Sequence, residues 1–218
     1  MPKLADARLQ AVLFDWDGTL LDSFDADSSA YLAMFRELGI PWGLSELAAH
    51  YTPNWHHVYR AAKIPRSKWD IADKLWAKNY AHHAPKLVPG ARRVLAWVAR
   101  RYQLGLVTSG DRVRVPRQLR YFGLTRLFAS RVCAGDTTQK KPHPAPLRLA
   151  LKQMCLEPSA CVYVGDSPHD LEMSKRAGVR AIAVIGRFPT EAGLRAAKPE
   201  FLLNSLKELP AVLKRLEK

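Results

Sequence analysis

Carboxylates, hydroxyl groups and a lysine follow four separate apolar runs of the sequence, each near the point where the run ends. These residues are Asp15 and Asp17, then Thr108, Ser109 and Gly110, then Lys141, and finally Asp166 and Asp170. Clustered carboxylates repel one another unless a cation lies among them, and a few hard oxygen ligands beside a phosphate suit Mg²⁺. If the fold brings the four groups together, they form a magnesium site beside a phosphoryl-binding site.

Such a site has the groups that phosphoryl transfer requires. Thr108 and Lys141 would hold the anionic oxygens, and Gly18 and Gly110 would let the backbone approach them. One carboxylate can attack phosphorus as a covalent nucleophile, because the metal and the lysine offset the charge repulsion. A carboxylic acid two residues further along can protonate the leaving oxygen and then deprotonate the attacking water.

The apolar runs have the length of strands and lack the alternation of half-exposed strands. They cover Gln10–Phe14, Gln103–Val107, Arg131–Ala134, Cys161–Val164 and Ala181–Ile185. Helical patterns separate them at Gly90–Arg101, Arg112–Phe122, Pro144–Cys155 and Pro168–Ala177. This alternation predicts an α/β fold with a doubly wound, Rossmann-like parallel sheet, whose ligands bind beyond the carboxyl ends of the strands.

One long segment breaks the alternation. Residues 22–88 contain no convincing buried strand but carry helical patterns at Ser23–Leu38, Leu44–Tyr51, Trp55–Ala62 and Ser67–His82. We therefore expect a helical domain of residues 22–88, inserted after the first strand of a core formed by residues 1–21 and 89–218. The C-terminal segment Asn204–Lys218 has the pattern of an amphipathic helix packed on the sheet.

Four motifs in this order resemble those of the haloacid dehalogenase-like superfamily, in its phosphatase branch of the phosphoglycolate phosphatase and β-phosphoglucomutase type. Asp15–Thr19 matches DxDGT, and Thr108 ends an apolar strand as in the second motif. Lys141 lies in a KPxP sequence, and Gly165–Asp170 matches GDxxxD. The resemblance covers nearly the whole chain.

The resemblance implies a role for each motif residue. Asp15 corresponds to the nucleophile and a metal ligand, and Asp17 to the general acid/base, whose backbone carbonyl also binds Mg²⁺. Thr108 and Lys141 correspond to the phosphoryl-binding pair. Asp166 corresponds to a further metal ligand, and Asp170 to an outer-shell or alternative acidic ligand. We leave Asp111 and Asp136 as turn or capping residues, and expect His143 to pack beside Lys141.

The helical insertion resembles the cap domain of this family, which closes over the cleft and excludes water. In the cap, His56 and His57 follow the Thr52-Pro53 break at the start of a helix, where free N–H groups suit an anionic ligand. We therefore expect Gly18, Ser109, Gly110, His56 and His57 to bind the substrate. Packing inside the cap is the competing explanation for its aromatic residues and histidines.

The leading hypothesis is a magnesium-dependent phosphatase acting on a small phosphorylated metabolite. Candidate substrates are phosphoglycolate, a nucleotide, a sugar phosphate and pyrophosphate. A phosphomutase would use the same Asp15 and Asp17, so the motifs do not separate the two activities. A non-enzymatic binding protein on the same scaffold is the third alternative. A dehalogenase or a phosphonate hydrolase is disfavoured, because Asp17 matches the acid/base that phosphatases carry.

Composition limits the partners. The formal net charge is +14, but the basic residues are spread over helical stretches, which favours solvated faces over a nucleic-acid site. No apolar run is long enough to span a bilayer, and MPKLADARLQ lacks the apolar stretch of a secretory signal.

Three cysteines without CxxC spacing indicate free thiols in a reducing cytoplasm. The sequence does not indicate the oligomeric state.

Overall fold

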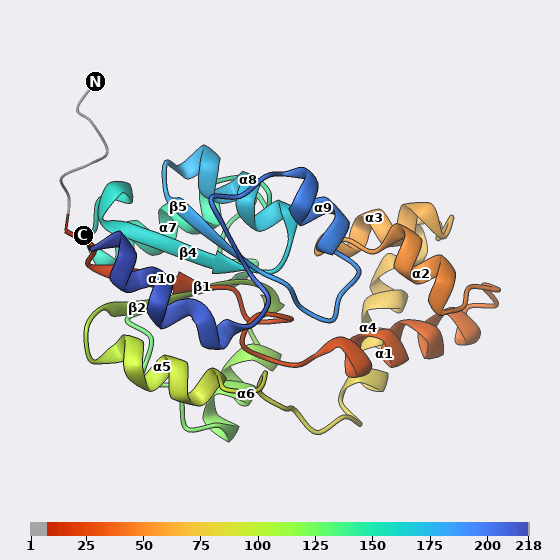
Figure 1. The fold of residues 1–218 in the computed structure, drawn as a ribbon. Coiled ribbons are helices and arrows are strands. Elements are labelled where there is room, and N and C mark those ends of the chain that lie inside the picture. Colours follow the sequence, from red (N-terminus) through yellow and green to blue (C-terminus); the bar gives the residue numbers. More distant parts are fainter. Residues whose placement is uncertain (1–7, 218) are drawn as a thin grey trace.

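A computed structural model of the chain describes residues 8–217. Six parallel strands form one sheet in the order β3-β2-β1-β4-β5-β6, which confirms the predicted doubly wound sheet (Figure 1). The strands are β1 (Ala11–Phe14), β2 (Gln103–Asp111), β3 (Ser130–Ala134), β4 (Cys161–Gly165), β5 (Arg180–Val184) and β6 (Phe201–Leu203). The central strand β1 pairs on both sides, with Val12 opposite Leu104 of β2 and Val162 of β4.

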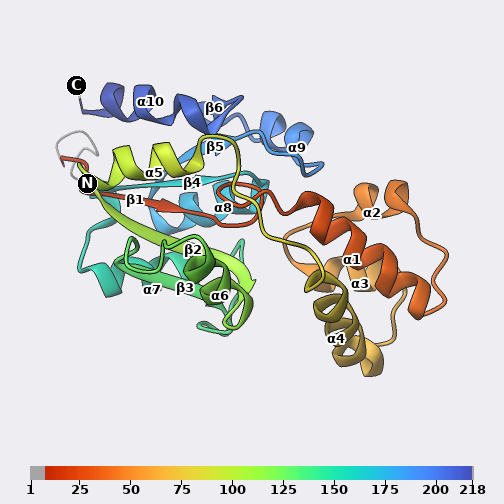
Figure 2. The same ribbon diagram turned by 90° about the horizontal axis from the view of Figure 1, so that it is seen from below.

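Helices cover both faces of this sheet, as Figures 1 and 2 show. One face carries α5 (Ala91–Ala99), α6 (Arg114–Tyr121) and α10 (Leu209–Leu216), and the other carries α7 (Ala145–Met154) and α8 (Pro168–Ala177). Side chains of a strand alternate between faces, so Val12 and Phe14 enter the first core while Ala11 and Leu13 enter the second. Burial on both faces explains why β1 is apolar throughout.

The inserted segment forms a helical unit beyond the carboxyl ends of the strands, as the predicted fold class requires (Figure 2). It contains α1 (Phe24–Glu37), α2 (Leu44–His50), α3 (Trp55–Ala61), the short helix η1 (Arg66–Lys68) and α4 (Trp69–Tyr80). These helices bury a core of their own, which includes Met34, Phe35, Val58, Tyr59 and Ala72. We refer to this unit as the cap.

The two connections between core and cap run side by side. The Asp22 N–H donates a hydrogen bond of 2.8 Å to the Lys86 carbonyl, and the Val88 N–H donates one of 2.9 Å to the Leu20 carbonyl. A lid held by two adjacent connections can move as one body about them. The division into domains at residues 22 and 88 stays a prediction.

Some elements differ from the sequence prediction. The strand β2 continues to Asp111, and the edge strand β6 and the helix α9 (Glu191–Ala196) were not predicted. The predicted helix Asn204–Lys218 consists of η3 (Leu206–Glu208) followed by α10, which has Pro210 in its first turn. The described residues do not include residues 1–7 or Lys218. Most of the segment MPKLADARLQ, which was considered as a secretory signal, therefore lies outside them.

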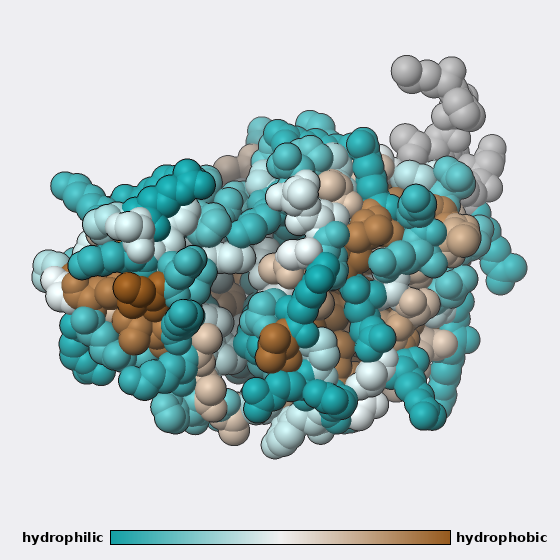
Figure 3. Space-filling view, turned by 180° about the vertical axis from the view of Figure 1, so that it is seen from behind, coloured by the Kyte–Doolittle hydropathy of each residue, from teal (hydrophilic) through white to brown (hydrophobic). Residues whose placement is uncertain are grey.

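The surface seen from behind is mostly hydrophilic, with small hydrophobic patches on both units (Figure 3). Among residues 8–217, no helix has the length and apolar character needed to cross a membrane. Cys133 and Cys161 are buried in the core, as expected for small apolar packing residues, and Cys155 is exposed.

Candidate active site

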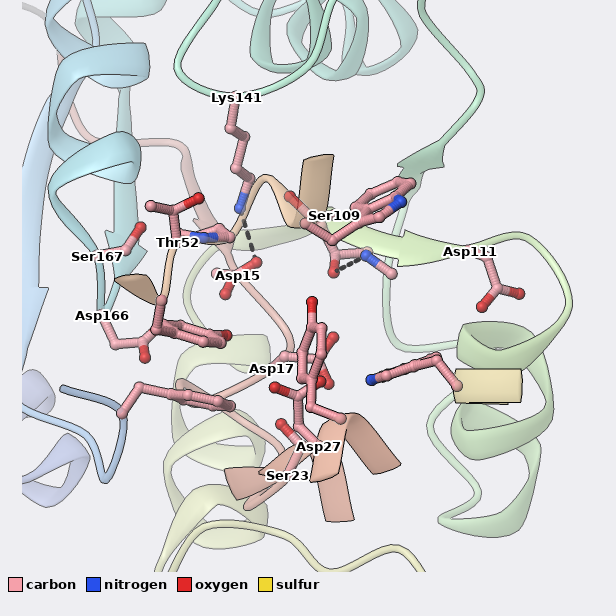
Figure 4. Close-up of a pocket in the computed structure, with 18 of the residues that line it drawn as sticks. Asp15, Asp17, Ser23, Asp27, Thr52, Ser109, Asp111, Lys141, Asp166 and Ser167 are labelled. Carbon is pink, nitrogen blue, oxygen red and sulfur yellow. Dashed lines mark hydrogen bonds and ion pairs between the residues drawn. The ribbon is translucent and has the colours of Figure 1, made fainter. Parts of the chain in front are cut away.

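A cavity of about 310 Å³ lies between the carboxyl ends of the strands and the cap, lined by residues of both. Figure 4 shows Lys141 pointing toward Asp15 at the sheet edge, with Asp166 and Ser167 on one side. Asp17 lies beside Ser23 and Asp27, which come from the start of the cap (Figure 4). The fold thus gathers residues from distant parts of the sequence around one cavity.

Lys141 lies at the centre of the buried polar cluster. Its Nζ donates hydrogen bonds of 2.7 Å to Asp15 Oδ1, 2.8 Å to Asp170 Oδ1 and 2.8 Å to the Tyr163 hydroxyl. Burial opposes the charged form, but the two carboxylates outweigh it and raise the pKa of Lys141. All three donors of the ammonium group are therefore used to fix its charge beside Asp15.

Three buried carboxylates, Asp15, Asp166 and Asp170, have oxygens within 4.8 Å of one another. Burial raises the pKa of Asp15 to about 7, although Lys141 opposes this shift. Burial and the charges of Asp15 and Asp170 also raise the pKa of Asp166 well above its ordinary value. One lysine does not balance three carboxylates, so this oxygen cluster fits a hard divalent cation such as Mg²⁺.

The three acids differ in how many partners they already have. Asp166 Oδ1 accepts one hydrogen bond of 3.0 Å from Thr19 Oγ1. Both oxygens of Asp170 are engaged, because Oδ1 accepts from Lys141 and Oδ2 accepts from the Ser167 hydroxyl at 2.6 Å. Asp170 is therefore better placed to hold Lys141 than to bind a metal directly, in line with an outer-shell role.

The turn after β1 has room for only a glycine at position 18. Gly18 has a φ of +80°, and a Cβ there would lie 2.8 Å from Asp166 Cγ. The glycine therefore permits the left-handed turn and the close approach of Asp166 to the backbone.

The segment after Val107 forms another part of the cavity wall. Thr108, Ser109 and Gly110 all line the cavity, and Thr108 Oγ1 accepts a hydrogen bond of 2.9 Å from the Gly110 N–H. The pairing of β2 with β3 shifts register between Val107 and Asp111. This irregularity frees the backbone near Thr108 from the sheet, so its polar groups can face a ligand.

Asp17 is held by Arg114, which is one of the basic residues whose spread over helical stretches predicted solvated faces. Arg114 Nη1 and Nη2 donate to the two carboxylate oxygens of Asp17 at 2.8 and 2.7 Å. The Arg114 side chain is only 15% exposed, which contradicts the solvated-face interpretation for this residue. Burial opposes ionisation, but Arg114 outweighs it and holds the pKa of Asp17 below its ordinary value. In the sequence, the short distance between Arg114 and the second motif is the one sign that Arg114 could contact Asp17.

Two other polar residues of the site also escaped the sequence analysis. Tyr163 lies in the apolar run of β4, where nothing distinguishes it from a core residue, yet its hydroxyl contacts Lys141. Asp27 of α1 lines the cavity from the cap side. Burial and the Asp17 charge raise the pKa of Asp27 to about 8, although Arg114 and Trp76 oppose the shift.

The structure does not bring His56 and His57 to the cavity wall. His56 stacks on Trp69 inside the cap, with 4.5 Å between the ring centroids, and His57 is exposed. Their role in substrate binding stays a prediction that the cavity lining does not support. His143 is exposed, and its Nδ1 accepts from the Ala145 N–H at the start of α7, which corrects the expected packing beside Lys141.

The two acidic residues expected to be turn or capping residues both accept hydrogen bonds from backbone groups close to them in the sequence. Asp111 Oδ1 accepts from the Val113 and Arg114 N–H groups, and Asp136 Oδ2 accepts from the Cys133 N–H. Asp111 also lines the cavity, so its carboxylate adds to the negative charge there.

Comparisons with known proteins agree with this architecture. A family model described as haloacid dehalogenase-like hydrolase matches residues 12–184. The pyrophosphatase PpaX of Bacillus mycoides is 28% identical over 215 residues, covering 96% of this chain and 99% of the relative. CbbY from Rhodobacter sphaeroides, solved in complex with phosphate, is 25% identical with a TM-score of 0.78, covering 92% of this chain and 96% of CbbY.

A third similar protein was solved as a predicted phosphoglycolate phosphatase from Haemophilus somnus. It has a TM-score of 0.81 at 21% identity and covers 94% of this chain and 97% of its own, which supports the fold alone. The family model spans most of the chain and includes all four motifs. The chain therefore belongs to the haloacid dehalogenase-like hydrolase family, as the motifs predicted.

Proposed function

We propose that this chain is a magnesium-dependent phosphatase that hydrolyses a small phosphate monoester through a phosphoryl group carried on Asp15. The observation that carries the proposal is the buried ion pair of 2.7 Å between Asp15 and Lys141 at the cavity wall. A carboxylate beside a fixed ammonium group can approach an anionic phosphoryl group, because the lysine offsets the repulsion.

Two steps follow from the residues in the cavity. Asp15 forms a bond to phosphorus as the bond to the leaving oxygen breaks, and Asp17 gives that oxygen a proton. Water then attacks the phosphoryl group on Asp15, Asp17 accepts a proton from the water, and phosphate and free Asp15 result. Lys141, Thr108 and backbone N–H groups near Ser109 and Gly110 hold the phosphoryl oxygens in both steps.

The metal would be held by Asp15, Asp166 and the backbone carbonyl of Asp17, with Asp170 in the outer shell. When bound, Mg²⁺ neutralises charge that develops on the phosphoryl oxygens. The excess of buried carboxylates over positive charge in this cluster supports the assignment.

The cap, proposed as residues 22–88, restricts what can enter. A cavity of about 310 Å³ suits a small metabolite better than a macromolecule. Pyrophosphate is one candidate, because a relative that is 28% identical is named a pyrophosphatase. Phosphoglycolate is the other candidate, because the motifs resemble those of phosphoglycolate phosphatases. A cavity of this volume disfavours a nucleic acid as the substrate. A cytoplasmic location would supply small phosphorylated metabolites.

The test is a screen of phosphorylated metabolites for released phosphate, with Mg²⁺ and with excess chelator. Metal-dependent release by the native chain, absent from Asp15→Asn, is expected. Full turnover in excess chelator would contradict the metal assignment. Product analysis with a sugar phosphate separates hydrolysis from the alternative phosphomutase activity, and absence of turnover on every ester would favour a binding protein.

A further inference from the structure

Arg114 is the second positive charge of the cavity wall. Among the described residues that line the cavity, seven are aspartates, and Lys141 and Arg114 are the basic residues. Lys141 donates to Asp15, Asp170 and Tyr163, and from this place beside Asp15 it is the proposed partner of the phosphoryl group. Arg114 is thus the remaining positive charge of the wall that a second group of the ligand can contact.

The guanidinium group of Arg114 is held in place by groups other than Asp17. It lies 4.9 Å from the centroid of the Tyr80 ring, and Nη1 donates at 3.3 Å to Gln118 Oε1. Gln118 is itself fixed, because its Oε1 accepts from Trp16 Nε1 at 2.9 Å. A Cβ at Gly110 would lie 2.6 Å from Arg114 Nη2, so the glycine makes room for the guanidinium group. The site is therefore built from the core and from the end of the cap helix α4.

This built site already binds a carboxylate. The two Nη atoms of Arg114 face the two oxygens of Asp17 as a fork, which is the geometry that Arg uses for carboxylates and phosphates. While this pair persists, both oxygens of Asp17 point to Arg114. The proposed proton transfer requires that an oxygen of Asp17 faces the leaving oxygen of the substrate. The pair must therefore open during the reaction, and another anion is a suitable replacement for Asp17.

We propose that Arg114 binds a second anionic group of the substrate, a carboxylate or a phosphate, and that this exchange releases Asp17 toward the leaving oxygen. The inference rests on the proposed function and narrows its substrate class to compounds with a second anion near the phosphoryl group. When an anionic group of the substrate replaces Asp17, the charge of Arg114 stays paired inside the cavity. A neutral substrate would leave this charge without a partner.

The other charged and aromatic side chains of the cavity could favour a different class of substrate. The cap side of the wall carries Asp27 and Asp73 together with aromatic rings such as Trp55, Trp76 and Tyr31. Aromatic faces and acids would favour a cationic or polyhydroxylated substrate if Arg114 stayed on Asp17. Comparison of anionic and neutral substrates therefore separates the two possibilities.

The experiment compares phosphoglycolate with its neutral amide, glycolamide phosphate, which has the same length and the same phosphoryl group. The variants are Arg114→Gln, Arg114→Lys and the control Arg117→Gln, which removes a charge from an exposed position of the same helix. The native chain and the control should prefer phosphoglycolate in kcat/KM by about 10- to 100-fold, the range of a charge-assisted pair. In Arg114→Gln, the ratio of the two kcat/KM values should be close to one. In Arg114→Lys, the ratio should lie between that value and the native value.

The release of Asp17 has its own readout. In Arg114→Gln, kcat for glycolamide phosphate should rise, since Asp17 is no longer held, while kcat/KM for phosphoglycolate falls. Equal losses on both substrates, or a native chain that does not distinguish them, would overturn the inference. Thermal melting of each variant shows that it is folded, and Arg114→Lys keeps the comparison available if Arg114→Gln does not fold.

A binding measurement separates this inference from the proposed function. In an Asp15→Asn background, in which turnover is not expected, calorimetry with the two compounds should show the same preference and the same dependence on Arg114. Failure of the native chain to hydrolyse any ester would refute the proposed function, whereas this comparison would still decide whether Arg114 binds the second anion.

Discussion

Replacement of Lys141 by methionine tests the electrostatic basis of the site. Methionine has a similar length, so Lys141→Met removes the charge while it keeps most of the packing volume. In the native chain, Nζ forms ion pairs of 2.7 Å with Asp15 and 2.8 Å with Asp170, and the Lys141 side chain is only 4% exposed. The variant therefore leaves two buried carboxylates without their positive partner.

The expected loss of stability follows from the burial of this ion pair. Removal of one partner of a buried ion pair destabilises proteins by about 3 to 5 kcal/mol, because an uncompensated buried charge remains. For a chain of this size, the loss corresponds to a decrease in melting temperature of roughly 6 to 20 °C. Added Mg²⁺ should recover part of it, since the cation restores positive charge beside the carboxylates.

The assay is thermal and denaturant unfolding at pH 7.5 in chelator, and then in Mg²⁺, together with phosphatase activity. The control is Lys140→Met, because Lys140 Nζ lies 3.6 Å from the centroid of the Trp55 ring and forms no ion pair with a described residue. Lys140→Met should lower the free energy of unfolding by less than about 1 kcal/mol. Equal destabilisation by the two variants, or a loss below about 1 kcal/mol for Lys141→Met, would refute the reasoning.

Further predictions concern the acid, the metal and the cap. Asp17→Asn should reduce hydrolysis of an alkyl phosphate more than that of an aryl phosphate, since the better leaving group needs less protonation; equal losses in kcat would argue against the acid role. Gly18→Ala should displace Asp166, whose Cγ would lie 2.8 Å from the new Cβ, and should raise the Mg²⁺ concentration for half-maximal activity by about 10-fold or more. Gly123→Ala is its control, because that glycine has a φ of +68° but no atom within 4 Å of the added Cβ. Asp27→Asn should flatten the dependence of stability on pH. The folded-state pKa of Asp27 is raised to about 8, so the folded chain binds a proton that the unfolded chain loses near pH 4, and native stability falls as the pH rises between these values. The stability of the variant relative to the native chain should therefore increase between pH 4 and pH 8, by up to about 5 kcal/mol, measured by unfolding from pH 4 to 9; parallel pH profiles would contradict the raised pKa.

The fold was predictable because its main strands are buried on both faces. All four residues of β1 are fully buried, so the run Ala11–Phe14 is apolar without alternation. The short strand β6 was not predictable in the same way, because a run of three residues at the sheet edge carries little pattern. The start of α10 depends on Ser205, whose Oγ accepts from the Lys207 N–H and favours a separate short helix before it.

The motif residues were predictable because each follows a strand whose end lies at the same sheet edge. Their partners were not. Nothing in the apolar sequence of β4 shows that the Tyr163 hydroxyl reaches Lys141, a contact that requires the packing of two distant segments. Arg114 is one of many basic residues, and only the bend after β2 brings it to Asp17, 97 positions earlier in the sequence. Long-range pairs of this kind depend on tertiary structure, which local patterns do not encode.

The covalent step on Asp15 is the central claim, and its most direct measurement is capture of the phosphoryl group. Native chain mixed with Mg²⁺ and a good aryl phosphate is quenched in acid within the first turnovers, and its peptides are analysed by mass spectrometry. We predict one added phosphoryl group on the peptide that contains Asp15, absent from Asp15→Asn and from samples with chelator. Turnover without any covalent adduct at the earliest times, or retained turnover in folded Asp15→Asn, would contradict the account.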